Sequence, residues 1–212
     1  MAENIDIYDA NLAHLGVMER VQAHLTGQWH RAFHCWVVSA DGKVLLQKRS
    51  PSSAGYPSLL DVSAAGHLEA GESVLAGARE ITEELGIPVA VEELHFLGER
   101  VEVADLTNGH LNREFQSVHL LRCDVPLSGY QADPGEVVGL VWLPITDGYQ
   151  LFDGSVRELT LSGYRFSADG AWEPFDMAVT TESFVPRIQR YYVTALIMAE
   201  RLLAGIGPLA IS

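Results

Sequence analysis

The alternation of hydrophobic and polar residues predicts a chain of short strands. Residues 32–49 resemble two strands around Asp41-Gly42, a dipeptide typical of a tight hairpin turn. A second hairpin is expected around Asp169-Gly170. Residues 50–58 hold two prolines and a glycine and are expected to form a loop. Further strands are predicted at 59–66, 94–103, 115–123 and 137–143.

Two segments instead repeat at helical spacing. A helix is predicted from Val74 to Leu85, with Ser73 as its N-cap, Leu75 on its apolar face and Gly86 at its C-terminal cap. A second amphipathic helix is predicted from Ile188 to Leu203. A strand or arm followed by a loop is expected for residues 5–27.

Composition and charge limit the function classes. The chain has 212 residues, of which 48% are hydrophobic, and carries 28 acidic and 14 basic residues, a formal charge of −14. This acidity argues against a general nucleic-acid binder, because such binding relies on clustered Lys and Arg. Phosphate substrates remain open, because a divalent metal inverts the local field. The two cysteines, Cys35 and Cys123, are too few for a disulfide scaffold.

Neither end of the chain has the pattern of a targeting or membrane segment. The N-terminal residues are acidic and lack the charged-then-apolar order of a signal peptide. The apolar stretch 188–206 is interrupted by Arg190, Glu200 and Arg201, so it is not expected to span a membrane. A cytoplasmic protein without membrane contact is the expectation.

Three carboxylates share one face of the first predicted helix. At helical spacing Glu80, Glu83 and Glu84 fall within about 100° of arc. Alone, such a cluster is usually a solvated acidic face. Here a glycine-rich loop, residues 66–72, leads into the helix, and together they form an oxygen-rich site suited to Mg²⁺ or Mn²⁺. Such an ion would bind diphosphate oxygens and lower the pKa of a bound water.

The string GHLEAGESVLAGAREITEELGI, residues 66–87, closely resembles the signature of the Nudix hydrolases. The resemblance implies a Nudix α/β/α sandwich, a mixed α/β fold with a mixed β-sheet. It implies metal binding by Glu72, Glu80, Glu83 and Glu84, and structural roles for Gly66, Arg79 and Gly86. The catalytic carboxylates are then expected among Glu80, Glu83 and Glu114.

The sequence departs from the family signature in one respect, because six residues, not seven, separate Glu72 from Arg79. The loop at 72–74 is expected to absorb the deletion.

The resemblance extends over residues 5–145 and is closest to the hydrolases related to isopentenyl-diphosphate isomerase. It implies a second metal site at His30, His67 and Glu114, with His24 as a fourth candidate ligand. Two departures count against isomerase chemistry. Ala65 stands where the isomerase needs a cysteine, and the strand after residue 96 lacks its tyrosine.

The resemblance and the local charges also suggest how a substrate is bound. His67, Arg49, Lys48 and Arg31 are the candidate substrate-binding residues, although solvated surface charges are an equally ordinary interpretation of the cations. The expected domain covers residues 1–150, including an N-terminal arm, and residues 151–212 form a C-terminal extension with a hairpin-like segment and a helix.

Three functions follow from these observations. The expected one is metal-dependent hydrolysis of a small organic diphosphate, such as a nucleoside diphosphate linked to another group. An isomerase and a catalytically silent nucleotide-binding module are the alternatives. By resemblance a homodimer is also allowed.

Overall fold

The buried strand β3 (Trp29–Val38) is the centre of the structure, a computed structural model that describes residues 3–211. Along one edge β3 pairs in parallel with β8 (Leu111–Arg122). Its other neighbours, all antiparallel, are β1, β6 and β4, of which β4 meets it only at Val38 and Val44. Their bounds are Asn4–Tyr8, Ala64–His67 and Lys43–Arg49.

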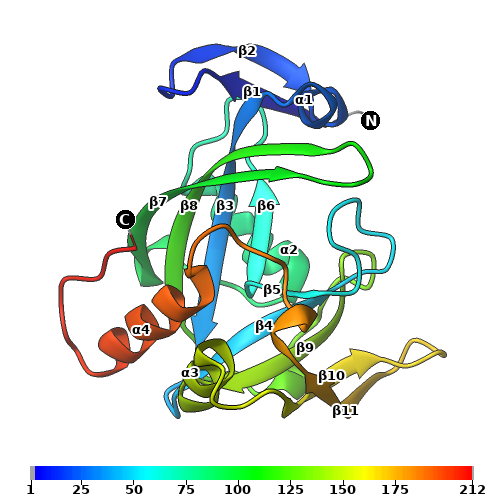
Figure 1. The fold of residues 1–212 in the computed structure, drawn as a ribbon, viewed down its shortest axis with the longest axis vertical. Coiled ribbons are helices and arrows are strands. Elements are labelled where there is room, and N and C mark those ends of the chain that lie inside the picture. Colours follow the sequence, from blue (N-terminus) through cyan, green and yellow to red (C-terminus); the bar gives the residue numbers. More distant parts are fainter. Residues whose placement is uncertain (1–2, 212) are drawn as a thin grey trace.

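The strands β3 and β4 therefore diverge from a single point of contact. The short strand β5 (Leu60–Asp61) pairs with β4, and β6 pairs with β3, so both lie in the widening gap (Figure 1). The strand order is β11-β10-β9-β4-β3-β1-β2, and β7 pairs with β8. The remaining strands are β2 (His14–Glu19), β7 (Leu94–Asp105), β9 (Val137–Pro144), β10 (Leu159–Phe166) and β11 (Trp172–Val179).

Helices cover both faces of this mixed sheet, as expected for the sandwich. Successive residues of β3 point to opposite faces, so Phe33 packs toward α2 (Arg79–Leu85) while Trp36 packs toward α4 (Tyr191–Leu203). The helix α3 (Ile145–Asp153) lies on the α4 side. At the N-terminal end, α1 (Arg20–Thr26) follows the β1–β2 hairpin (Figure 1).

Most strand predictions are confirmed, but the single strand expected before Gly66 is divided into β5 and β6. Several helical predictions are corrected. Residues 5–27 begin with a strand, as expected, but β2 and α1 follow it in place of the loop. The predicted helix 74–85 begins only at Arg79, after a 3₁₀ turn at Ala76–Ala78, and this turn leaves Leu75 52% exposed. The last helix begins at Tyr191, so Ile188 precedes it and is exposed.

The helix α3 was not expected, because Pro144 and Gly148 look like breakers in the sequence. Pro144 in fact occupies the position before the first helical turn, where a missing N–H costs nothing. At Gly148, a Cβ would lie 2.6 Å from Cδ1 of Leu196. This glycine therefore permits α3 and α4 to approach each other closely.

Residues 151–212 pack directly onto the sheet. The strand β10 pairs with β9, and α4 contributes buried residues to the core around Trp36. The division of the chain at residue 150 stays a prediction. Among the helices of residues 3–211, none is both long enough and apolar enough to cross a membrane.

The packing of α4 can be tested with neighbouring residues. Leu196 is 1% exposed and Ile197 is 40% exposed. Leu196→Ala is expected to lower the free energy of unfolding by about 2–5 kcal/mol, because it leaves a cavity. Ile197→Ala, the matched control, should cost about 1 kcal/mol or less. Urea unfolding measures both, and equal losses would contradict this packing.

Candidate active site

A cavity of about 590 Å³ opens where β3 and β4 diverge. It is lined by residues of α1, β4, β5, β6, α2 and β8, and by the segment of residues 180–190 that connects β11 to α4. Several predicted site residues meet there although they are far apart in sequence. These are Arg49, Gly66, His67, Arg79, Glu80, Glu83, Glu84 and Glu114.

Two glutamates of α2 are buried at the floor of the cavity. Glu84 accepts hydrogen bonds from the backbone N–H of Ala65 at 2.9 Å and from Nε2 of Gln47 at 3.1 Å. Glu80 packs against Gly66, where any Cβ would overlap its carboxyl group. Burial raises the pKa of Glu80 to about 7 and that of Glu84 well above its ordinary value. A cation bound close to these carboxylates would therefore stabilise their charged form.

The guanidinium of Arg79 gathers the other acidic groups of this segment. It forms ion pairs of 2.7 Å with Glu80 and with Glu83, whose side chain is 57% exposed. Its Nε lies 2.8 Å from Glu72. A 3₁₀ turn at Ala76–Ala78 lies between Glu72 and Arg79 and leads straight into α2, and absorption of the missing residue by the loop at 72–74 stays a prediction. Glu72 still reaches Arg79 but does not line the cavity.

Beside this floor, three histidines and a glutamate converge. One ring nitrogen from each of His24, His30 and His67 lies within 4.8 Å of the other two. Oε1 of Glu114 is 3.9 Å from Nε2 of both His30 and His67. Nδ1 of His30 donates a hydrogen bond to the carbonyl of Gln28. In the neutral ring, Nε2 therefore carries the lone pair. That nitrogen is buried and has no hydrogen-bond partner among residues 3–211.

Two predicted substrate-binding residues are not brought to the cavity. Gln47 and Arg49 of β4 line it, but Lys48 between them does not, because alternate residues of a strand point to opposite sides. Arg31 of β3 instead pairs with Glu99 at 3.1 Å and lies over the ring of Tyr8. Of the four candidates, the structure therefore places only Arg49 and His67 in the cavity wall.

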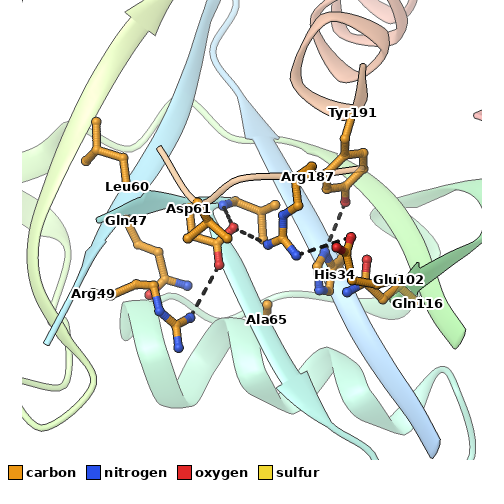
Figure 2. A network of polar contacts seen from close by, with 12 residues as sticks. His34, Gln47, Arg49, Leu60, Asp61, Ala65, Glu102, Gln116, Arg187 and Tyr191 are labelled. Atoms are coloured by element: carbon orange, nitrogen blue, oxygen red, sulfur yellow. Dashed lines mark hydrogen bonds and ion pairs between the residues drawn. The ribbon is translucent and has the colours of Figure 1, made fainter. Parts of the chain in front are cut away.

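Sequence reasoning missed a buried ion-pair network beside the cavity (Figure 2). Asp61, 3% exposed, pairs with Arg49 at 3.3 Å and with Arg187 at 2.5 Å. Burial opposes ionisation of Asp61, but the two arginines outweigh it and keep its pKa below the ordinary value. A charged residue inside the apolar run LLDV is a signal that could have revealed Asp61. No local motif marks Arg187.

The network continues to the histidine cluster. Nη1 of Arg187 faces Glu102 at 3.6 Å, and Glu102 pairs with Arg100 at 2.6 Å. Arg100 donates to the amide oxygen of Gln116, whose amide nitrogen donates to Glu114 at 2.5 Å. Buried hydrogen bonds and ion pairs thus connect the cavity wall at Asp61 to Glu114.

A comparison with known proteins agrees with this geometry. A model of the NUDIX domain matches residues 28–160. The chain belongs to the Nudix superfamily. An uncharacterized Nudix hydrolase of Clostridium acetobutylicum is 32% identical over 197 residues, which cover 92% of this chain and 95% of that protein. The family match and this relative identify the chain as a hydrolase that acts on phosphoric anhydrides.

The chain is also similar to an isomerase of the superfamily and to a solved structure. An isopentenyl-diphosphate Delta-isomerase of Nocardia farcinica is 30% identical over 141 residues, 66% of this chain and 78% of that protein. The crystal structure of DR0079 from Deinococcus radiodurans is 26% identical, with a TM-score of 0.54, and covers 72% of this chain and 90% of its own. The predicted Nudix membership and fold are confirmed.

Stability should depend on pH through the buried His34. Its Nδ1 lies 3.0 Å from the hydroxyl of Tyr191, and burial lowers the pKa of His34 to about 3. Below pH 6.5 the unfolded chain takes up a proton there that the folded chain does not, so this contribution to stability is lost as the pH falls. The stability advantage of the native protein over His34→Gln should therefore decrease by about 1 kcal/mol from pH 6.5 to 5.5.

Urea unfolding of both proteins at the two pH values measures this difference. His95→Gln at an exposed position is the matched control and should leave the pH dependence unchanged. Parallel pH curves for the native protein and His34→Gln would contradict the burial of a neutral imidazole.

Proposed function

We propose that this chain is a Mg²⁺- or Mn²⁺-dependent hydrolase that cleaves the diphosphate bond of a nucleoside diphosphate-X or a related small organic diphosphate. The observation that carries this proposal is the buried carboxylate pair Glu80 and Glu84, packed against Gly66 and Ala65 at the floor of the cavity. A divalent cation bound there would stabilise the charged form of both carboxylates, and Nudix hydrolases generally need divalent metal ions.

The donor chemistry fits two different kinds of metal ligand set. Glu80, Glu84 and the more exposed Glu83 offer carboxylate oxygens, which suit Mg²⁺ and Mn²⁺. The set of His24, His30, His67 and Glu114 offers mainly imidazole nitrogen, which Mn²⁺ tolerates better than Mg²⁺. The buried, unpartnered Nε2 of His30 is the atom that a metal would satisfy. Glu72, held by Arg79, is proposed to contribute by fixing that arginine.

Divalent cations held by these residues would supply charge neutralisation at phosphate oxygens and would lower the pKa of a bound water. The protein's own groups position the reactants. Arg49 in the cavity wall is proposed to donate to phosphate oxygens. Arg79 and Gly86 keep α2 and its carboxylates in place, Arg79 through its ion pairs and Gly86 as a left-handed C-cap. Among the candidate bases Glu80, Glu83 and Glu114, Glu83 is the most exposed and is proposed to accept the proton of the attacking water.

The two alternatives have less support in the site. Isomerisation needs an acid–base thiol, but Ala65 offers only its backbone N–H, to Glu84. Cys35 is fully buried in the core beneath α2, and burial raises its pKa. A silent nucleotide-binding module would not need the carboxylates of Glu80, Glu83 and Glu84 to meet at one cavity.

The partners follow from the same chemistry. The substrate is proposed to be a small molecule, since a chain of charge −14 lacks the basic surface that bulk nucleic-acid binding requires. A homodimer and a cytoplasmic location stay predictions.

The role of Glu83 can be tested directly. Because its side chain is exposed, Glu83→Gln should leave the unfolding midpoint unchanged. Loss of a general base is expected to lower Mg²⁺-dependent turnover by about 100-fold or more. Phosphate release is measured on a panel of nucleoside, sugar, dinucleoside and isoprenoid diphosphates.

Glu92→Gln, at an exposed position outside the cavity, is the control and should retain full activity. Full activity of folded Glu83→Gln would remove that residue from the mechanism. Binding of panel members without turnover by the native protein would favour the silent module, and an isomeric diphosphate as product would favour the isomerase.

A further inference from the structure

Arg187 reaches the cavity from outside the part of the chain that matches the NUDIX domain, which ends at residue 160. It lies in the connecting segment of residues 180–190. This segment is anchored on β5, because the N–H of Val185 donates to the carbonyl of Leu60 at 2.9 Å and Phe184 forms a parallel bridge with Leu60. The register of this anchor brings Arg187 to Asp61, the residue after Leu60.

The guanidinium of Arg187 is held in one orientation. Its side chain is 7% exposed and lies between Asp61 at 2.5 Å and Glu102 at 3.6 Å (Figure 2). The ring of Tyr191 lies 5.8 Å from its central carbon. Most of the conformational entropy of this long side chain is therefore lost on folding, and a ligand that binds to it does not have to order it.

Asp61 bridges two arginines that line the same cavity. Its Oδ1 binds Arg187 and its Oδ2 binds Arg49. Gln47, which pairs with Asp61 across β4 and β5, donates to Glu84. Asp61 and its strand partner Gln47 thus place the two guanidinium groups beside Glu84, one of the buried glutamates of the proposed metal site.

Both arginines line the cavity, and each has guanidinium N–H groups that are not bonded to Asp61. The 3.6 Å separation between Nη1 of Arg187 and Glu102 is too long for a hydrogen bond. Arg49 uses Nε for the carbonyl of Gly55 and Nη1 for Asp61, and its side chain is 26% exposed. Two guanidinium groups in fixed positions suit the several oxygens of a diphosphate, because each presents N–H groups in a rigid fork.

We propose that Arg187 is a substrate-binding residue that acts with Arg49, the two guanidinium groups donating hydrogen bonds to the diphosphate oxygens from the side of Asp61. The C-terminal residues 151–212 then form part of the active site. This inference rests on the proposed diphosphate hydrolase function.

The test is a binding measurement that does not need turnover. Isothermal titration calorimetry with methylenediphosphonate, a non-hydrolysable diphosphate, is carried out in saturating Mg²⁺ on the native protein, Arg187→Gln and Arg187→Lys. Arg190→Gln, an exposed arginine of the same segment, is the matched control. Arg187→Gln should weaken binding by about tenfold or more, and Arg187→Lys by less, since lysine retains the charge but not the fork. Arg190→Gln should bind as the native protein does.

Manganese binding, followed by electron paramagnetic resonance, separates a substrate role from a structural one. The affinity for Mn²⁺ should remain within about twofold of the native value in every folded variant. If Arg187→Gln does not fold, Arg187→Lys carries the test. Native diphosphonate affinity in either folded Arg187 variant overturns the inference. So does a parallel loss of Mn²⁺ and diphosphonate binding, which would assign Arg187 a structural role.

The outcome for the native protein distinguishes the two proposals. Hydrolysis of a diphosphate by the native protein, together with unchanged diphosphonate binding in the Arg187 variants, overturns the inference alone. A native protein that neither binds the diphosphonate nor hydrolyses any member of the panel overturns the proposed function, and the inference with it.

Discussion

The burial of Glu80 and Glu84 is the constraint on which the arrangement of the site depends. Removing a carboxylate from water is costly unless hydrogen bonds or a cation compensate it. The fold supplies part of this compensation through the N–H of Ala65, the amide of Gln47 and the guanidinium of Arg79. Burial still raises the pKa of both glutamates despite these contacts. A divalent cation at the cavity floor would complete the compensation, which links the stability of this region to the proposed chemistry.

The divergence of β3 and β4 creates the space for that chemistry. Because the two strands share only one residue pair, β5 and β6 fit between them and present Asp61 and Gly66 to the cavity. A glycine is required at position 66 because the Glu80 carboxyl group occupies the position of a side chain. The connecting segment of residues 180–190 then closes one wall and adds a cation. Negative groups from α2 and positive groups from β4 and the connecting segment therefore meet in one cavity, and the overall charge of −14 does not describe its electrostatics.

Local patterns predicted the parts of this structure that depend on local interactions. The turn dipeptides marked the β10–β11 hairpin and the turn between β3 and β4, and the spacing of Glu80, Glu83 and Glu84 marked the acidic face of α2. The start of α2 was misjudged, because a 3₁₀ turn and a helix share similar apolar spacing over three residues. Lys48 was grouped with Arg49, although strand alternation separates them.

Contacts between distant segments explain what the sequence could not reveal. Asp61 and Arg187 are separated by more than a hundred residues, and only the anchor between Leu60 and Val185 brings them together. The approach of α3 to α4 through Gly148 also depends on a partner residue far along the chain, Leu196. Neither pairing leaves a periodic or motif-like trace in the sequence.

The claim that buried carboxylates of α2 bind the catalytic metal is tested most directly by anomalous X-ray diffraction from crystals soaked in Mn²⁺. The account predicts an anomalous peak within about 2.5 Å of carboxylate oxygens of both Glu80 and Glu84, on the side that faces Arg49. A second peak among His24, His30 and His67 is expected from their nitrogen donors. If crystals soaked in saturating Mn²⁺ show no anomalous peak beside Glu80 and Glu84, the central claim is contradicted.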